Sequence, residues 1–327
     1  MIDLSLFEEK IFSQHGEDGI IRKLFQIIGV VNKNYVEFGT ENGMESNTRY
    51  LRENHGWSGL LMDCENENLS INLHKEFITA ENINDLFKKY NVPKNFDLLS
   101  IDIDYNDFYI WKSIKNKYKP RVVVIEYNAT HQITEDKIVK YNPFNFWDGT
   151  NYFGASIKSL YNLGRKKGYS LIYAENTGVN LFFLRDDVLE NGNYKFKDMN
   201  NIELIYKSPK YGDGQNGGHV EDLKKREYVS FKNIRFSQFL FREFLKFNYF
   251  FENLIITTIN ITRTIIIFIN ELLRFEEISF FKKLLKFTHN YLEKNIELRD
   301  ISFKLLKILF NFKNPVYLKQ VYNRMVS

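Results

Sequence analysis

Three aspartates follow closely on an apolar run near the middle of the chain. The stretch Phe96–Ile101 reads as a buried strand, and Asp102, Asp104 and Asp107 come directly after it. Carboxylates at the end of a strand can bind a divalent cation, take a proton from a hydroxyl group or hydrogen-bond the hydroxyls of a sugar. A simple polar turn does not need so much negative charge. The chemistry of this stretch therefore depends on which other side chains the fold brings to it.

A second acidic strand end lies further along the chain, where Glu126 and Asn128 close the apolar run 121–127. If the two strands are parallel neighbours, their carboxyl ends meet at one edge of the sheet, and alternation along a strand puts Asp102 and Asp104 on one side. We expect these four side chains to form an oxygen-ligand set for Mg²⁺ or a similar cation, which would polarise an acceptor hydroxyl. Direct proton removal by Asp104, or simple hydrogen bonding of the carboxylates to a sugar, are the alternatives.

A glycine-containing turn follows the first predicted strand, which carries Glu37. Gly39 and Gly43 would let the backbone approach a ligand, and the next helix would offer free N–H groups; a tight turn is the simpler alternative. Their spacing is not the GxGxxG of a pyrophosphate loop, which counts against NAD and ATP. Asp63, which ends the second predicted strand, stands where an acidic residue bonds ribose hydroxyls in Rossmann-like folds. The order of these residues predicts a nucleoside-binding site.

Strands alternate with helices up to about residue 185. We expect strands at residues 35–38, 57–63, 76–79, 97–103, 121–127, 169–173 and 179–184, and helices at 19–28, from about 47, and at 83–90, 110–118 and 156–167. This alternation predicts an α/β fold with a mostly parallel sheet and helices on both of its faces.

The motifs, taken in order, resemble a known family. The segments YVEFGTENG, GLLMD, TAENI, DLLSIDIDYNDFYIW and VVVIEYN resemble class I S-adenosylmethionine-dependent methyltransferases, and more narrowly bacterial O-methyltransferases of surface-polysaccharide sugars. FSQHGEDGII, YFGAS and GVNLFFLR extend the resemblance over residues 10–230. It implies a Rossmann-like methyltransferase sheet, S-adenosyl-L-methionine as cofactor, and methyl transfer to a hydroxyl of a nucleotide-linked sugar destined for a capsule or similar polymer.

The resemblance also implies roles for individual residues. Glu37 would bond the amino end of the methionyl group, Gly39 and Gly43 would line it, and Asp63 would hold the ribose hydroxyls. The other implied cofactor contacts are Gln14, His15 and Asn47 at the carboxylate end, Asp102 beside the cofactor, and Asn82 with Ile83 near the adenine. His15 could equally cap the helix that follows it.

The predicted metal ligands also resemble those of a known group of enzymes. Metal-dependent catechol and macrolide-sugar O-methyltransferases carry their ligands after the same two strands, although Glu126-Tyr-Asn128 departs from the Asp-Asn pair of many of them. Besides Asp102 and Asp104, His131 is a candidate general base, because an unperturbed imidazole suits proton removal near neutrality. A solvated loop histidine is the alternative. His219 is a further candidate base if its glycine-rich loop folds over the site, and residues 152–156 could wall the acceptor pocket or pack in the core.

The charge and cysteine content of the chain limit its expected partners and location. The chain has 327 residues, 45 of them basic and 41 acidic, so its net charge of +4 predicts no large footprint for nucleic acid. The single cysteine, Cys64, and an N-terminus without the basic start and apolar core of a signal peptide favour a cytoplasmic protein.

The sequence changes character near residue 230. Residues 1–230 would form the methyltransferase domain, and residues 231–327, rich in Phe, Ile, Leu and Lys at helical spacing, an all-helical region for oligomerisation or interaction. Its most apolar run, Leu254–Ile269, contains Asn260 and Arg263 and is too short for a bilayer span, so no transmembrane segment is expected. The alternative function is a non-catalytic assembly or membrane-associated component that uses the Rossmann-like domain as a scaffold.

Overall fold

The structure, a computed structural model, describes residues 1–234, which form one compact unit. Its strands are β1 (Asn34–Phe38), β2 (Ser58–Asp63), β3 (Leu73–Lys75), β4 (Asn95–Ile101), β5 (Lys119–Glu126), β6 (Ile138–Val139), β7 (Tyr169–Ala174), β8 (Asn180–Arg185) and β9 (Tyr228–Val229). Its α-helices are α1 (Glu17–Ile28), α2 (Arg49–His55), α3 (Ile83–Lys89), α4 (Asp107–Ser113), α5 (Ile157–Lys167), α6 (Asp186–Asn191) and α7 (Ile202–Ile205), and two 3₁₀ turns are η1 (Leu4–Phe7) and η2 (Leu69–Ile71).

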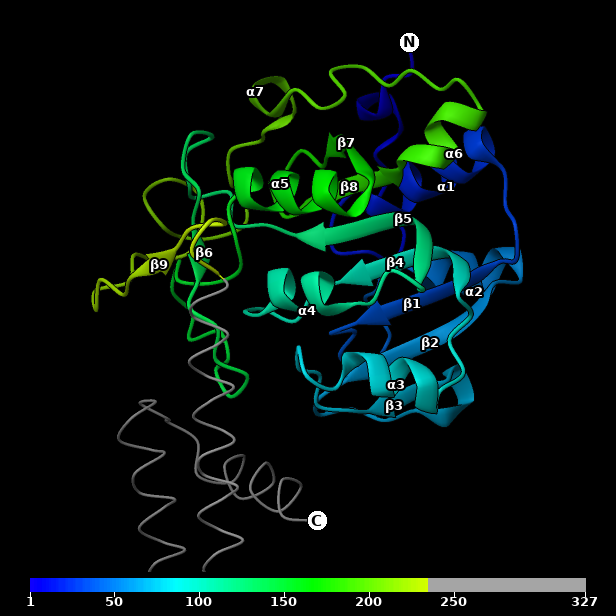
Figure 1. Ribbon diagram of the computed structural model, residues 1–327, viewed down its shortest axis with the longest axis horizontal. Helices are drawn as coiled ribbons and strands as arrows, with labels where there is room; N and C mark the ends of the chain where they lie inside the picture. The colour runs from blue at the N-terminus through cyan, green and yellow to red at the C-terminus, as the bar shows by residue number, and fades with distance from the viewer. Residues whose placement is uncertain (235–327) are drawn as a thin grey trace, which may run out of the picture. The chain divides into compact units, whose positions relative to one another are not determined.

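Seven strands form one sheet in the order β3-β2-β1-β4-β5-β8-β7, and β6 and β9 pair separately (Figure 1). β3, β2, β1, β4 and β5 are parallel neighbours, whereas β8 runs antiparallel to both β5 and β7. The expected α/β fold with a mostly parallel sheet is confirmed. The carboxyl ends of β1, β4 and β5 lie on the same side of the molecule (Figure 1).

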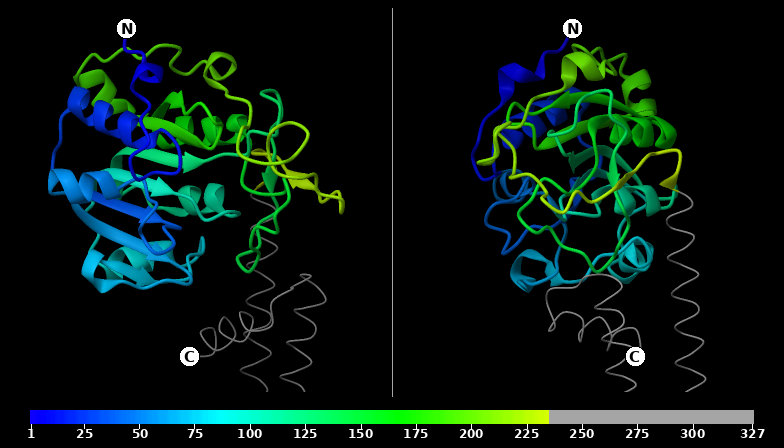
Figure 2. Two further views of the ribbon diagram at one scale, coloured as in Figure 1. Left: turned by 180° about the vertical axis from the view of Figure 1, so that it is seen from behind. Right: turned by 90° about the vertical axis from the view of Figure 1, so that its left-hand side faces the viewer.

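Helices cover both faces of this sheet, also as expected. α3, α4 and α5 lie in front of it in Figure 1, and α1 and α2 lie on the opposite face in the left panel of Figure 2. On the first face the ring of Trp111 in α4 lies 4.9 Å from that of Phe183 in β8. On the second, Phe25 of α1 packs at 4.7 Å from Trp57. Because both faces are covered, β4 and β5 are buried along almost their whole length rather than at alternate positions.

Three predicted boundaries are wrong. The third strand is residues 73–75, not 76–79; it is short and has a single fully buried side chain, Leu73, so it left no periodic signal. β4 ends at Ile101, before the aspartates, and α4 begins at Asp107 rather than at Ile110. The second and third differences move the aspartates from a strand into a turn and a helix start, which changes where their side chains lie.

The predicted helical region and its expected role in oligomerisation lie outside the described residues, apart from residues 231–234. The run Leu254–Ile269 lies outside them as well. Within residues 1–234, no helix combines the length and the apolar character that crossing a membrane requires.

Candidate functional site

The site begins where the strand order reverses. β1 has β2 on one side and β4 on the other, and open α/β sheets bind ligands at the carboxyl ends of strands at such a switch point. Gly39, directly after β1, has a φ of +67°, and a Cβ atom there would lie 1.5 Å from the carbonyl oxygen of Asp102. Gly39 is therefore needed for the close approach of the ends of β1 and β4, and its N–H donates to the carbonyl of Met62 at 3.0 Å.

A cavity of about 310 Å³ opens at this edge of the sheet. Its walls come from the ends of β1, β2, β4 and β5 and from two later segments, residues 143–147 and 211–219. Eight of its lining side chains are carboxylates, and no lysine or arginine within residues 1–234 lines it. The cavity is therefore rich in acidic side chains, and it suits a ligand that carries positive charge or hydrogen-bond donors.

Glu37 lines the cavity but uses both of its carboxylate oxygens inside the protein. One oxygen accepts a hydrogen bond from the backbone N–H of Asn47 at 2.7 Å, and the other accepts from the N–H and hydroxyl of Thr48. Burial raises the pKa of Glu37. Asn47 in turn donates to the hydroxyl of Ser100 at 3.0 Å. Glu37 thus fixes the loop after the glycine turn, which brings Asn47 to the cavity wall.

Asp63 ends β2 at the cavity and keeps one oxygen partly free. Its Oδ1 accepts three hydrogen bonds, from the N–H of Glu65 and from the backbone and side chain of Asn66. Its Oδ2 accepts one, from the N–H of Glu41 at 3.0 Å. Because a carboxylate oxygen can accept two hydrogen bonds or more, Oδ2 retains capacity for a ligand hydroxyl.

Four other residues implied as cofactor contacts, Gly43, His15, Asn82 and the fully buried Ile83, do not line the cavity. Gly43 has a φ of +77° and is packed against Ile71, so a turn rather than a ligand requires it. The N–H of His15 is held by Glu17 at 2.9 Å. Both polar atoms of the Asn82 side chain form hydrogen bonds within the turn before α3: its Oδ1 accepts from the N–H of Thr79 and its Nδ2 donates to the carbonyl of Phe77.

Their neighbours in sequence line the cavity instead. Gln14, which precedes His15, lies on its wall, and so do Phe77 and Ile78, which precede the turn at Asn82. The motifs therefore indicated the right segments, while the side chain that faces the cavity differs by one or a few positions.

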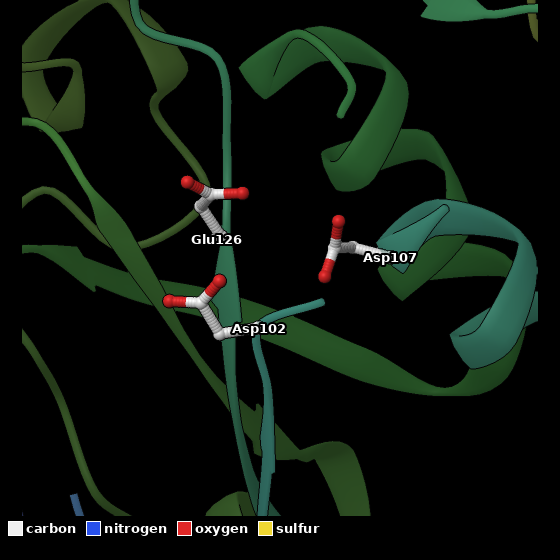
Figure 3. Close-up of side chains that lie close together, drawn as sticks. All are labelled: Asp102, Asp107 and Glu126. Carbon is white, nitrogen blue, oxygen red and sulfur yellow. The ribbon is translucent and has the colours of Figure 1, made fainter. Parts of the chain in front are cut away.

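Asp102 and Glu126, which line the other end of the cavity, form a group with the buried Asp107 that we call the carboxylate cluster. One oxygen from each lies within 4.8 Å of the others (Figure 3). Asp107, the first residue of α4, is completely buried; its Oδ1 accepts from the N–H of Ile103 at 2.7 Å. Its Oδ2 and the Oε2 of Glu126 are buried without a hydrogen-bond partner among the described residues.

The electrostatics of the carboxylate cluster favour uptake of positive charge. Burial raises the pKa of Asp107 to about 7. Burial and the neighbouring carboxylates also raise the pKa values of Asp102 and Glu126 well above the ordinary range. Three carboxylates held this closely are stable only if they bind protons or a cation, and their oxygens are the ligands that a hard divalent cation prefers.

Asp107 takes the place that Asp104 and Asn128 were predicted to share. Asp104 is exposed on the cavity wall and has a φ of +63°, so strand alternation no longer applies to it. Asn128 is fully buried, donates to the carbonyls of Asn151 and Phe153, and accepts from Thr130. Its amide has no atom left for a cation.

The structure brings His219, not His131, to the cavity. His131 is buried under the ring of Tyr228, 4.7 Å away, and burial lowers its pKa to about 4. It does not line the cavity. His219 lines it, with its ring 4.3 Å from that of Trp147 and 5.0 Å from that of Tyr211, and burial lowers its pKa.

The segments that carry these rings, 143–147 and 211–219, gave no motif of their own in the sequence. Comparison with known proteins adds no name, since neither a protein-family model nor a curated protein matches the chain. The fold and the cavity define the class as an α/β protein with a Rossmann-like, mostly parallel sheet and an acidic cavity at its switch point.

Proposed function

We propose that the protein is an S-adenosylmethionine-dependent O-methyltransferase that acts on a sugar hydroxyl. The observation that carries the proposal is the acidic lining of the cavity, which has eight carboxyl side chains and, within the described residues, no lysine or arginine on its walls. S-adenosylmethionine bears a sulfonium and an ammonium group, which such a site attracts. The phosphates of a dinucleotide or of ATP would be repelled.

Each end of the cavity has a part in this reaction. At the β2 end, Oδ2 of Asp63 is the acceptor for a ribose hydroxyl, and Phe77 and Ile78 offer apolar contact for an adenine ring. At the β5 end, the carboxylate cluster lies where an acceptor hydroxyl would lose its proton. Methyl transfer needs that proton removed and the oxygen placed in line with the methyl group, so positioning and a base are its main demands.

A divalent cation fits the carboxylate cluster. Asp102, Asp107 and Glu126 would hold it, and the unpartnered buried oxygens of Asp107 and Glu126 support this donor set. Bound there, a cation such as Mg²⁺ would polarise the acceptor hydroxyl and ease its deprotonation. Without it, the same carboxylates would accept the proton themselves.

The acceptor class comes from the family resemblance, which favours a nucleotide-linked sugar used in a capsule or other surface polysaccharide. The cavity adds a constraint. Since no lysine or arginine of residues 1–234 lines it, the diphosphate of such a substrate would lie outside the cavity while the sugar ring enters it.

Binding of S-adenosylhomocysteine to the full chain, measured by titration calorimetry, tests the proposal. We expect a dissociation constant on the order of micromolar, and we expect Asp63→Asn to weaken it about ten-fold or more. Glu67→Gln is the matched control, because Glu67 is exposed on the same loop and does not line the cavity.

Thermal unfolding of both variants shows whether the fold is retained. A wild-type chain that does not bind S-adenosylhomocysteine would overturn the proposal and favour a scaffold role for the domain. Equal affinities of folded Asp63→Asn and wild type would overturn the role of Asp63.

A further inference from the structure

Two buried asparagines, Asn106 and Asn180, line the cavity, and the side-chain carbonyl oxygen of each has no hydrogen-bond partner among the described residues. Asn106 is 5% exposed, and its Nδ2 donates to the backbone carbonyl of Asn142 at 2.9 Å. A backbone carbonyl can only accept, so this contact fixes which way the amide points. The Oδ1 of Asn106 is buried and has no hydrogen-bond partner among the described residues.

Asn180 repeats this arrangement on β8. It is 3% exposed, its Nδ2 donates to Oε1 of Glu17 at 2.9 Å, and its Oδ1 has no partner within residues 1–234. Glu17 is itself completely buried, and its second oxygen accepts from the N–H of His15. The Nδ2 group of Asn180 is therefore fixed by a hydrogen bond to a buried acceptor, as that of Asn106 is.

Both asparagines flank the carboxylate cluster. Asn106 directly precedes Asp107, and Asn180 pairs with Glu126 in the β5–β8 ladder. The cavity-lining atoms left buried and unpaired here, Oδ1 of Asn106, Oδ1 of Asn180 and Oε2 of Glu126, can all accept hydrogen bonds, as can the hydroxyl of Tyr211, which can also donate one. Buried acceptors without partners are costly, so a ligand that fills this end of the cavity has to bring donors to them.

We infer that this end of the cavity recognises a donor-rich sugar ring without an anionic group, and that Asn106 and Asn180 accept hydrogen bonds from its hydroxyl or amino groups. The inference rests on the proposed function and narrows its substrate class. A phosphate or carboxylate on the ring would bring acceptors to acceptors and negative charge to carboxylates. The indole of Trp147, whose Nε1 is anchored by the carbonyl of Thr150 at 2.8 Å, offers a face on which the ring's C–H groups can rest.

The test measures sugar binding to the full chain saturated with S-adenosylhomocysteine, by ligand-observed NMR with EDTA present to remove bridging cations. The probes are glucose, galactose and mannose, each with its 2-amino, 6-phosphate and uronic acid counterparts. We expect a neutral or amino member to bind about ten-fold more tightly, or better, than its anionic counterparts. Asn106→Leu and Asn180→Leu should each weaken that binding by a similar factor. Asn116→Leu, at an exposed position away from the cavity, is the control.

Three results would overturn the inference: anionic sugars that bind as well as the neutral ones, binding that folded leucine variants retain in full, or no binding by any member of the panel. The comparison among sugars uses the wild-type chain, so it stands even if a leucine variant fails to fold. Failure to bind S-adenosylhomocysteine would instead refute the proposed function. Binding of the cofactor product without the expected sugar preference would refute this inference alone.

Discussion

Asp107 shows how one buried side chain couples the site to pH. In the unfolded chain an aspartate has a pKa near its ordinary value, whereas burial raises that of folded Asp107 to about 7. Between these two values the folded state holds a proton that the unfolded state has lost. Stability therefore falls as pH rises through this window, and above it the folded chain carries a buried charge that weakens it.

Asp107→Asn should remove this penalty. Asparagine has the same shape, can keep the hydrogen bond from Ile103, and carries no charge. We expect the variant to gain about 2–4 kcal/mol over wild type at about pH 8 in EDTA, since three pKa units correspond to about 4 kcal/mol. At about pH 4 the difference should vanish. Urea unfolding at the two pH values measures it, and a gain that is equal at both would contradict the pKa of Asp107.

If the carboxylate cluster binds a cation, the cation should stabilise wild type more than Asp107→Asn. With Mg²⁺ or Mn²⁺ in place of EDTA at about pH 8, wild type should gain stability in proportion to the logarithm of cation concentration, and Asp107→Asn should gain little. Equal responses of the two proteins would exclude the carboxylate cluster as the cation site.

The sequence located these carboxylates but did not predict which of them meet. Asp102 and Glu126 could be placed because both follow long apolar strands whose ends are clear. Asp104 was chosen over Asp107 by assuming that strand alternation continues to residue 103. The left-handed backbone at Asp104 and the start of α4 at Asp107 break that alternation, and neither leaves a periodic signal in so short a stretch.

Among the elements, the turn after β1 has the tightest steric requirement at the site. Gly39 combines a positive φ with a backbone oxygen 1.5 Å from the position of a Cβ atom. Gly149 has a φ of +83° but nothing within 4 Å of that position. Alanine substitutions at these two glycines therefore distinguish two costs: both would strain the backbone, but only a Cβ atom at Gly39 would also clash with Asp102 and push the end of β4 away from β1.

Gly39→Ala should therefore be far more damaging than Gly149→Ala. The control should lose about 1 kcal/mol, the cost of a left-handed alanine. Gly39→Ala should lose several times as much, about 3 kcal/mol or more, and should also lose affinity for S-adenosylhomocysteine, because Asp102 has to shift. Urea unfolding and calorimetry test the two effects. Similar losses in both variants would show that the loop relaxes around the clash.

Most elements were predictable because their signals are long and regular. The strands buried on both faces contain uninterrupted apolar runs such as residues 122–125 and 181–184, and α1 and α5 have a continuous apolar stripe. β3 was misplaced because its three residues include His74 and Lys75, which look like loop. The sequence suggested His219 only on the condition that its glycine-rich loop folds over the site, and it gave no sign of the wall formed by residues 143–147, since irregular segments are positioned by tertiary contacts such as the packing of Trp147 on His219.

On the scale of the whole molecule, one end of the sheet forms the cavity and the other contains a stabilising ion pair. The ligand cavity lies at the carboxyl ends of the strands, while a buried ion pair lies in their amino-terminal halves. Arg121 of β5 contacts Asp97 of β4 at 2.9 Å, and both are almost completely buried. Arg121 also donates to the carbonyls of Ile28 and Gly29, and Asp97 accepts from the N–H groups of residues 31–33. The pair thus ties the connection from α1 to β1 onto the middle of the sheet.

Arg121→Met should destabilise the fold without disabling the site. It leaves the Asp97 carboxylate buried without its charged partner, a change that typically costs about 3–5 kcal/mol. Arg185→Met is the matched control, because the partner of Arg185, Asp187, is exposed, and such pairs contribute about 1 kcal/mol or less. Urea unfolding should show the large difference in stability between the two variants. Both should bind S-adenosylhomocysteine within about two-fold of wild type at a temperature where they are folded, since neither side chain lines the cavity. Folded Arg121→Met with much weaker binding would mean that the amino-terminal half of the sheet controls the geometry of the switch point, and that stability and ligand binding are coupled through β4 and β5.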